Sequence, residues 1–131
     1  MRLRIILGSS QPRSARVQLT LVEVERDRAY GVELHVATIG IRPKRMAAPW
    51  IGGERWLSLG PALRALTAGS EVAMTDDDAF ALRVVVDDEG PALLLAQRTR
   101  TGAAAPTERV RLASGQLAAL IEFVDEVARR L

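Results

Sequence analysis

The stretch SGQLAALIEFVDEVARRL, residues 114–131, decides the fold class, because it carries the clearest helical pattern in the chain. Its apolar residues recur at spacings of three and four, the pattern of a helix that buries one face. They are Leu117, Leu120, Ile121, Val124, Val127, Ala128 and Leu131. Ser114 is placed to cap the first turn. We therefore expect a long amphipathic helix over 114–130 that packs on an apolar surface.

Strand patterns precede this helix and supply that surface. Residues 80–86 (FALRVVV) and 92–100 (ALLLAQRTR) are joined by Asp-Asp-Glu-Gly at 87–90, residues typical of a hairpin turn. A loop at 101–107 and a short strand at 108–112 lead into the helix. The second half of the chain is therefore expected to be an antiparallel sheet followed by a helix.

The first half of the chain shows a similar order. Residues 2–7 form a predicted strand, and residues 16–25 and 30–39 alternate between apolar and polar side chains. Such alternation predicts paired strands that each bury one face. Residues 55–59 (RWLSL) are interpreted as a short strand, and a helix is predicted near 60–68.

These patterns predict an α+β fold in which antiparallel sheets pack against two helices within a single domain. We expect two pseudo-repeats of strands followed by a helix, 1–69 and 70–131. Residues 54–66 (ERWLSLGPALRAL) align without a gap on residues 108–120 (ERVRLASGQLAAL), and five of the thirteen positions are identical. The expected core consists of Leu19, Leu21, Val32, Leu34, Val36, Leu63, Leu66, Val84, Val86, Leu93, Leu95, Val110, Leu112, Leu117, Leu120, Ile121 and Val124.

The composition excludes several kinds of site. The 131 residues include no cysteine and one histidine, His35, so thiolate nucleophiles, disulfides and His-rich metal sites are excluded. No apolar run approaches the roughly 20 residues of a membrane span, and the apolar run near the N-terminus is too short for a signal peptide. We expect a cytoplasmic protein that is not an enzyme, holds no metal or other cofactor and does not bind membranes.

Basic charge is concentrated in the first half of the chain. Residues 1–60 contain ten Lys or Arg against five Asp or Glu, whereas residues 61–131 contain eight against eleven. The asymmetry indicates one basic face, although a genome of high GC content, which uses arginine in place of lysine, accounts equally well for the high arginine content.

Two groups of basic residues are candidate contacts for nucleic acid. Arg98 and Arg100 share one face of their predicted strand, and Arg109 and Arg111 share one face of the next. If these strands pair through the loop between them, four guanidinium groups lie on one sheet face. The alternative is that the arginines form the solvated face of an amphipathic sheet.

The second group lies in and beside residues 42–54, which prolines and glycines make irregular. It interleaves basic and aromatic side chains, a combination that suits single-stranded nucleic acid because cations contact phosphates and rings stack on bases. Its members are Arg42, Lys44, Arg45, Trp50, Arg55 and Trp56. Trp56 is equally compatible with a place in the core.

The pattern over residues 83–131 resembles the single-stranded-DNA-binding coactivators of the positive-cofactor-four type and their Whirly and PUR relatives. The shared order is strand, tight turn, Arg-bearing strand, flexible loop, short strand and a helix that ends in basic residues. The resemblance implies curved sheets that bind nucleic acid and helices that pack on each other. The acidic turn at 87–89 and the scarcity of aromatic residues in 92–100 depart from it.

A second resemblance points to a different class of function. The order read from LRALTAGSEVAMTDDDAFALRVVV, residues 63–86, is similar to that of small immunity proteins of bacterial toxin systems, of the WapI-associated type. Such proteins bind one protein partner, and the acidic turns would then be contact points. Single-stranded nucleic-acid binding is the first hypothesis, and a protein-partner-binding module is the alternative.

We also expect a homodimer, because the long helix carries more apolar surface than one small sheet covers.

Overall fold

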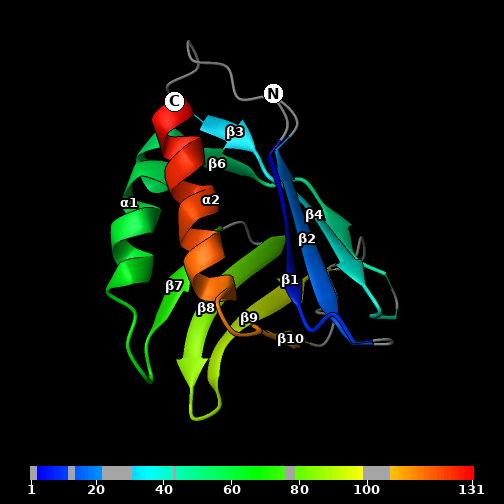
Figure 1. The fold of residues 1–131 in the computed structure, drawn as a ribbon. Helices are drawn as coiled ribbons and strands as arrows, with labels where there is room; N and C mark the ends of the chain where they lie inside the picture. Colours follow the sequence, from blue (N-terminus) through cyan, green and yellow to red (C-terminus); the bar gives the residue numbers. More distant parts are fainter. Residues whose placement is uncertain (1–2, 12–13, 22–30, 43, 76–78, 99–106) are drawn as a thin grey trace.

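The computed structural model describes six parts of the chain, residues 3–11, 14–21, 31–42, 44–75, 79–98 and 107–131. These residues form ten strands and two helices, which confirms the predicted α+β fold (Figure 1). All strand pairs among them are antiparallel.

The strands form two four-stranded sheets and one short ladder. The first sheet has the order β1 (Leu3–Gly8), β2 (Arg16–Leu21), β4 (His35–Ile39), β5 (Met46–Ala47). The short ladder pairs β3 (Gly31–Glu33) with β6 (Trp50–Gly52). The second sheet has the order β10 (Glu108–Arg111), β9 (Gly90–Gln97), β8 (Phe80–Asp87), β7 (Glu71–Ala73).

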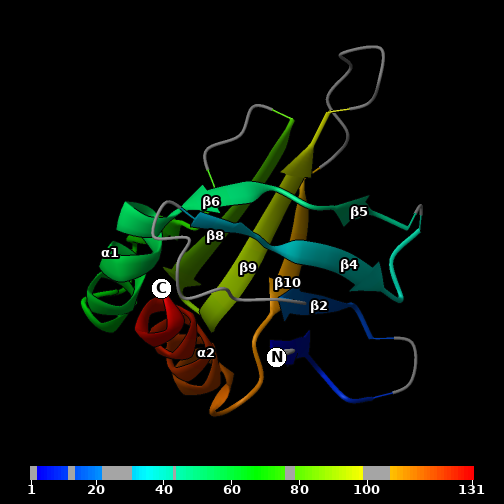
Figure 2. The ribbon, with the colours of Figure 1, turned by 90° about the horizontal axis from the view of Figure 1, so that it is seen from above.

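The two helices follow the two sheets in sequence and pack side by side. Helix α1 (Gly53–Arg64) follows the strands of the first half, and α2 (Gln116–Arg130) follows those of the second. Seen from above, the helix pair lies at one side of the sheets, and the strands of the first sheet cross those of the second (Figure 2).

Strands β3, β4, β5 and β6 form one continuous hairpin. The two ladders share a single register, since the residue numbers of every cross-strand pair add up to the same value. Between the ladders, the N–H of Leu34 donates to the carbonyl of Pro49 at 2.9 Å. Pro49 has no N–H to donate to the carbonyl of Leu34, so one hydrogen bond of the ladder is missing while the register stays the same. Side chains therefore alternate between the same two faces along the whole hairpin.

One apolar core joins both sheets and both helices. Val17, Leu19 and Leu21 of β2 are fully buried, as their alternation predicts. Most predicted core residues are buried as well. The exceptions, which are only partly buried, are Leu66, Val86, Leu117 and Ile121.

Helix α1 begins at Gly53 and ends at Arg64, so the predicted strand at 55–59 is wrong and the predicted helix at 60–68 is wrong in its boundaries. Trp56, Leu59 and Leu63 are buried on one side of the helix. Their spacing of three and four residues is helical, and it outweighs the alternation of apolar and polar residues that favours a strand.

The same result changes the meaning of the internal sequence match. Residues 54–58 are helical, whereas their aligned counterparts begin in strand β10. The match therefore does not relate structurally equivalent positions. Both halves run through an antiparallel sheet into a helix, and their origin by duplication stays a prediction.

Helix α2 confirms the long helix at the C-terminal end of the sequence, but its start differs from the prediction. The residue before its first turn is Gly115 at φ 81°, and Ser114 does not cap it. Leu120, Phe123, Val124 and Val127 are buried within the chain itself. The reasoning behind the expected homodimer thus loses its premise, and the oligomeric state stays a prediction.

The side chain of Gln116 fastens the start of α2 to the end of β1. Its Oε1 accepts from the backbone N–H groups of Gly8 and Ala113, each at 2.8 Å. Its Nε2 donates to the carbonyl of Gly8 at 2.9 Å. The carboxamide thus satisfies the two backbone groups of Gly8 that a neighbouring strand would otherwise pair.

We expect Gln116→Ala to lower the free energy of unfolding by about 1–3 kcal/mol, because it leaves partly buried backbone groups without partners. Gln116→Glu should cost less, since a carboxylate still accepts from both N–H groups. Gln11→Ala is the matched control, because Gln11 is exposed and should change stability by less than about 0.5 kcal/mol. Denaturant unfolding measures all three, and equal losses for Gln116→Ala and the control would contradict this role.

Candidate functional site

The outward face of the second sheet carries the arginines predicted there. Arg109 lies opposite Leu94 and Arg111 opposite Ala92, and strand alternation places Arg98 on the same face as these two β9 residues. The expectation that β9 pairs with β10 and gathers these arginines is therefore met for three of them. Arg100 lies outside the described residues.

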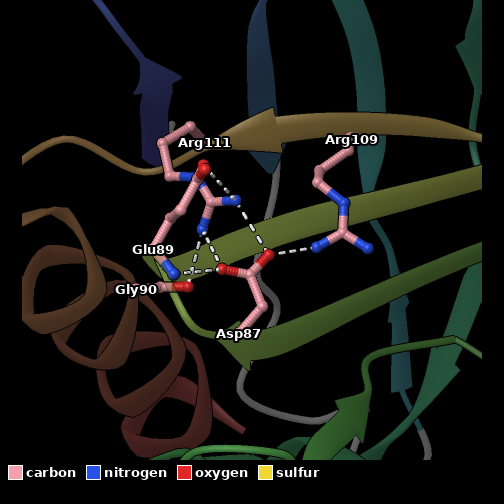
Figure 3. A network of polar contacts seen from close by, with 5 residues as sticks. All are labelled: Asp87, Glu89, Gly90, Arg109 and Arg111. Atoms are coloured by element: carbon pink, nitrogen blue, oxygen red, sulfur yellow. Dashed lines mark hydrogen bonds and ion pairs between the residues drawn. The ribbon is translucent and has the colours of Figure 1, made fainter.

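Acidic side chains neutralise most of that face. Arg111 contacts both carboxylate oxygens of Asp87, at 2.7 and 2.8 Å, and Arg109 forms an ion pair with the same carboxylate (Figure 3). Arg111 also donates to the carbonyl of Gly90 at 2.7 Å and lies 3.5 Å from Glu89. One aspartate at the end of β8 thus binds two arginines of β10 across the intervening strand β9, and its contact with Arg111 has the bidentate geometry that favours such pairs.

Asp87 is held in its ionised form by this network. Hydrogen bonds from Arg111 keep the pKa of the Asp87 carboxyl well below its ordinary value, with further help from the backbone N–H of Glu89 and the charge of Arg109. The pKa of Arg111 is raised by the same contact. Both groups therefore remain charged and paired at neutral pH.

Arg83, a further arginine of the second-sheet face, is charge-compensated as well. Arg83 pairs with Glu71 at 3.1 Å. A shallow groove of about 420 Å³ is lined by Glu71 and Arg109 together with Asp87 and Asp88. Arg98 is exposed and has no ion-pair partner in the described part of the chain. This face therefore offers one uncompensated guanidinium among the described arginines rather than the four that the strand pattern predicts.

We expect the free energy of unfolding to fall as the pH is lowered from about 5 towards about 2, because Asp87 binds a proton more readily in the unfolded chain than in the folded one. The ionised Asp87 makes its full contribution to the free energy of unfolding above the ordinary aspartate pKa of about 4. Asp87→Asn should remove part of this acid dependence. Asp125 and Glu126, whose pKa values are also lowered by arginine partners, should retain the rest.

Unfolding in denaturant at a series of pH values measures this effect. Asp88→Asn is the control, since Asp88 is the exposed neighbour of Asp87 and forms no ion pair with any described residue. An Asp87→Asn variant with the same acid dependence as the original chain would contradict the role of the network.

The predicted basic and aromatic group of residues 42–56 is divided by the fold. Trp56 is 0% exposed on the buried side of α1, so its ring is not accessible for stacking on bases. Arg45 is 5% exposed and crosses to the second sheet, where it donates to the carbonyl of Leu95 at 3.4 Å and lies 3.5 Å from Glu108. Arg55 is partly buried and donates to the carbonyl of Ala73 at 3.0 Å. Trp56 and Arg45 are buried, so the prediction that they lie on a binding surface is wrong, whereas for Arg55 it stays a prediction.

Arg42, Lys44 and Trp50 are exposed, as predicted. Arg42 and Lys44 lie in the turn between β4 and β5, and neither has an ion-pair partner among the described residues. Trp50 is 57% exposed on β6. Trp50 lies on the outward side of the hairpin, because its chain neighbour Ile51 is buried and successive side chains of a strand point to opposite faces.

Trp50 belongs to a wider outward surface, which we call the first-sheet face. The face is defined by the side chains of the first sheet and the short ladder that point away from the core. One row crosses all four strands of the first sheet, and the rest lie beside it. The row is Ile6, Gln18, Ala37 and Met46, and the other members used below are Thr20, His35, Glu33, Ala48 and Trp50.

The first-sheet face has an apolar surface with few acids. Met46 is 66% exposed, and Ile6 is exposed as well. Among the described residues of the face as defined above, Glu33 is the only acid, and it lies 3.6 Å from His35. Met46 and Gln18 are not found by sequence reasoning that looks for cations and aromatics. The outward phase of the strand alternation is the signal that could have found them.

The indole of Trp50 lies close to the backbone of a glycine. A side chain on Gly31 would place its Cβ 2.6 Å from Cζ2 of Trp50 and 2.2 Å from the carbonyl oxygen of Ile51. Gly31 also has φ 141°, which residues with a side chain rarely adopt. The indole ring therefore occupies space on the first-sheet face that a side chain at position 31 would need.

The comparisons with known proteins do not assign a family. No protein-family model matches the chain, and no curated protein matches it. Within the described residues, no group of three His, Asp or Glu side chains gathers in the way that a metal ion requires. Neither helix in the described part of the chain has the length and apolar character needed to cross a membrane.

Proposed function

We propose that this chain is a non-catalytic module that binds single-stranded nucleic acid through the first-sheet face. The observation that supports it is the exposed indole of Trp50, which lies on the same face as Met46 and His35. Exposed aromatic rings on a sheet stack on unpaired bases whatever their sequence. Such stacking needs bases that are free of a complementary strand, which favours single-stranded over duplex nucleic acid.

The electrostatics of the two sheets support this choice of surface. The arginines of the second sheet are bound to Asp87, Glu89 and Glu71, so a phosphate there would compete with an existing carboxylate. The exposed Arg42 and Lys44, by contrast, stand at the β4–β5 end of the first-sheet face without such a competitor among the described residues. Cations of this kind contribute the salt-dependent part of nucleic-acid affinity.

The size of the surface is suitable for more than one base. Met46, Ala48 and Trp50 are successive outward residues of one edge strand, so they cover about 13 Å at the usual rise per residue. The row of the first sheet extends the surface across the strands to Ile6. A single strand of nucleic acid can therefore follow the hairpin from the cations at its turn to the indole of Trp50.

Trp50→Ala should weaken binding of a labelled single-stranded oligonucleotide by about tenfold or more, the effect of losing one stacking ring. Leu57→Ala is the matched control, because Leu57 is also a large exposed apolar residue but lies on α1, outside the first-sheet face. Fluorescence anisotropy measures both affinities. Equal losses in the two variants, or none in Trp50→Ala, would contradict this use of Trp50.

Arg42→Ala combined with Lys44→Ala should flatten the dependence of affinity on salt. Each lost phosphate contact lowers the slope of log K against log salt by about 0.7 for a single strand. Arg109→Ala combined with Arg111→Ala should change the slope less, because these two arginines are already paired with Asp87. The same anisotropy titration, repeated between low and moderate salt, decides between the two sites.

A protein-binding module, such as a bacterial immunity protein, is the second candidate. The exposure of Met46 and Ile6 favours it, because methionine and other apolar side chains are common at protein interfaces and less suited than aromatic rings to stacking on bases. Absence of binding to any single-stranded oligonucleotide at low salt would favour this candidate. Trp50→Ala would then be expected to weaken capture of a protein partner.

A further inference from the structure

The first-sheet face contains a hollow whose shape follows from the register of the strands. Ala37 lies between Gln18 on β2 and Met46 on β5. Because a small side chain stands between two long ones, the surface is depressed at that point. The hollow has a volume of about 200 Å³, and Thr20 and His35 also line it.

The hollow presents a polar amide that is held in position. Nε2 of Gln18 donates to Oγ1 of Thr20 at 3.2 Å, and Thr20 is buried. One amide hydrogen and the amide oxygen of Gln18 have no partner among the described residues. A carboxamide with one donor and one acceptor available can form a pair of hydrogen bonds with the edge of a nucleobase.

The remaining walls suit a flat heterocycle. Met46 supplies a polarisable thioether, and the imidazole of His35 is 49% exposed beside the hollow. Histidine stacks on unpaired bases in nucleic-acid complexes. The thioether of methionine makes favourable contacts with aromatic rings, often at the ring edge. The volume is below the roughly 300–1,000 Å³ of pockets for larger organic ligands, so it is suited to one ring system and not to a whole nucleotide.

We propose that this hollow takes a single unpaired nucleobase and that Gln18 recognises its edge. The inference rests on the proposed function and adds selectivity to it: Trp50 stacks on bases without regard to sequence, and Gln18 distinguishes between them. The module then prefers strands that place a favoured base in the hollow.

The test compares twelve-nucleotide single-stranded DNAs made only of adenine, only of cytosine or only of thymine. The wild-type protein should bind the best of the three about tenfold more tightly than the weakest. Gln18→Ala should reduce this ratio below about twofold by weakening the best complex. Gln11→Ala is the control with the same change at an exposed residue elsewhere, and it should keep the wild-type ratio.

A second measurement reports on the hollow directly. His35 is the only histidine of the chain, so its imidazole protons give one unambiguous pair of nuclear magnetic resonance signals. These signals should shift when the preferred oligonucleotide is added. Thr20→Val, which removes the hydroxyl that holds the Gln18 amide, should lower the base preference while the unbound His35 signals show that the protein is folded.

The outcomes separate this inference from the proposed function. Binding of all three oligonucleotides with equal affinity would overturn base recognition in the hollow and leave the proposed function standing. A base preference that survives in Gln18→Ala, or His35 signals that do not move on binding, would overturn it as well. Absence of binding to every oligonucleotide at low salt would overturn both.

Discussion

The register of the hairpin formed by residues 31–52 is the constraint on which the candidate surface depends. Because side chains alternate with a period of two, a shift of one residue would turn Trp50 and Met46 into the core and expose Ile51 and Ala47. The core prevents that shift, since Val32, Leu34 and Val36 are buried on the inner side of the same hairpin. The polar and apolar residues that face outward are therefore positioned by the residues that face inward.

Two long-range contacts keep the first sheet in place against the second half of the chain. Arg45 extends from the hairpin turn to the backbone of Leu95, and Gln97 donates to the carbonyl of Met46 at 3.4 Å. At the opposite edge, Gln116 occupies the backbone groups of Gly8. Long polar side chains thus bond to carbonyl or N–H groups at both outer strands of the first sheet, which leaves its outward face available while its edges are partly satisfied.

The sequence predicts the class of the fold well because alternation and helical spacing report directly on burial. It correctly places the buried residues of β2 and most of the apolar side of α2. The prediction from sequence fails where a strand pattern and a helical pattern overlap. Residues 55–59 alternate over a short stretch as a strand would, but Trp56, Leu59 and Leu63 are spaced as on one side of a helix. The segment is helical because a helix buries all three of these side chains. Segment 42–54 is predicted to be irregular because it contains prolines and glycines, and its two strands, β5 and β6, are too short to show an alternating pattern before their pairing with β4 and β3 is known.

The candidate site is less predictable, for an electrostatic reason. Charge counted along the sequence does not show which cations are already paired. Arg109 and Arg111 look available in the sequence, but Asp87, more than twenty positions earlier, binds both of them across strand β9. Arg45 looks like part of a basic surface until the fold buries it. The two sheets therefore differ in the described residues. The arginines of the second sheet are mostly paired with carboxylates of the same sheet. The first sheet exposes the indole of Trp50, the thioether of Met46 and the amide of Gln18 on one outward face. Under the proposed function, shape and stacking would therefore come first in recognition, with charge supplied from the β4–β5 connection, because the positions of the carboxylates decide which arginines are available.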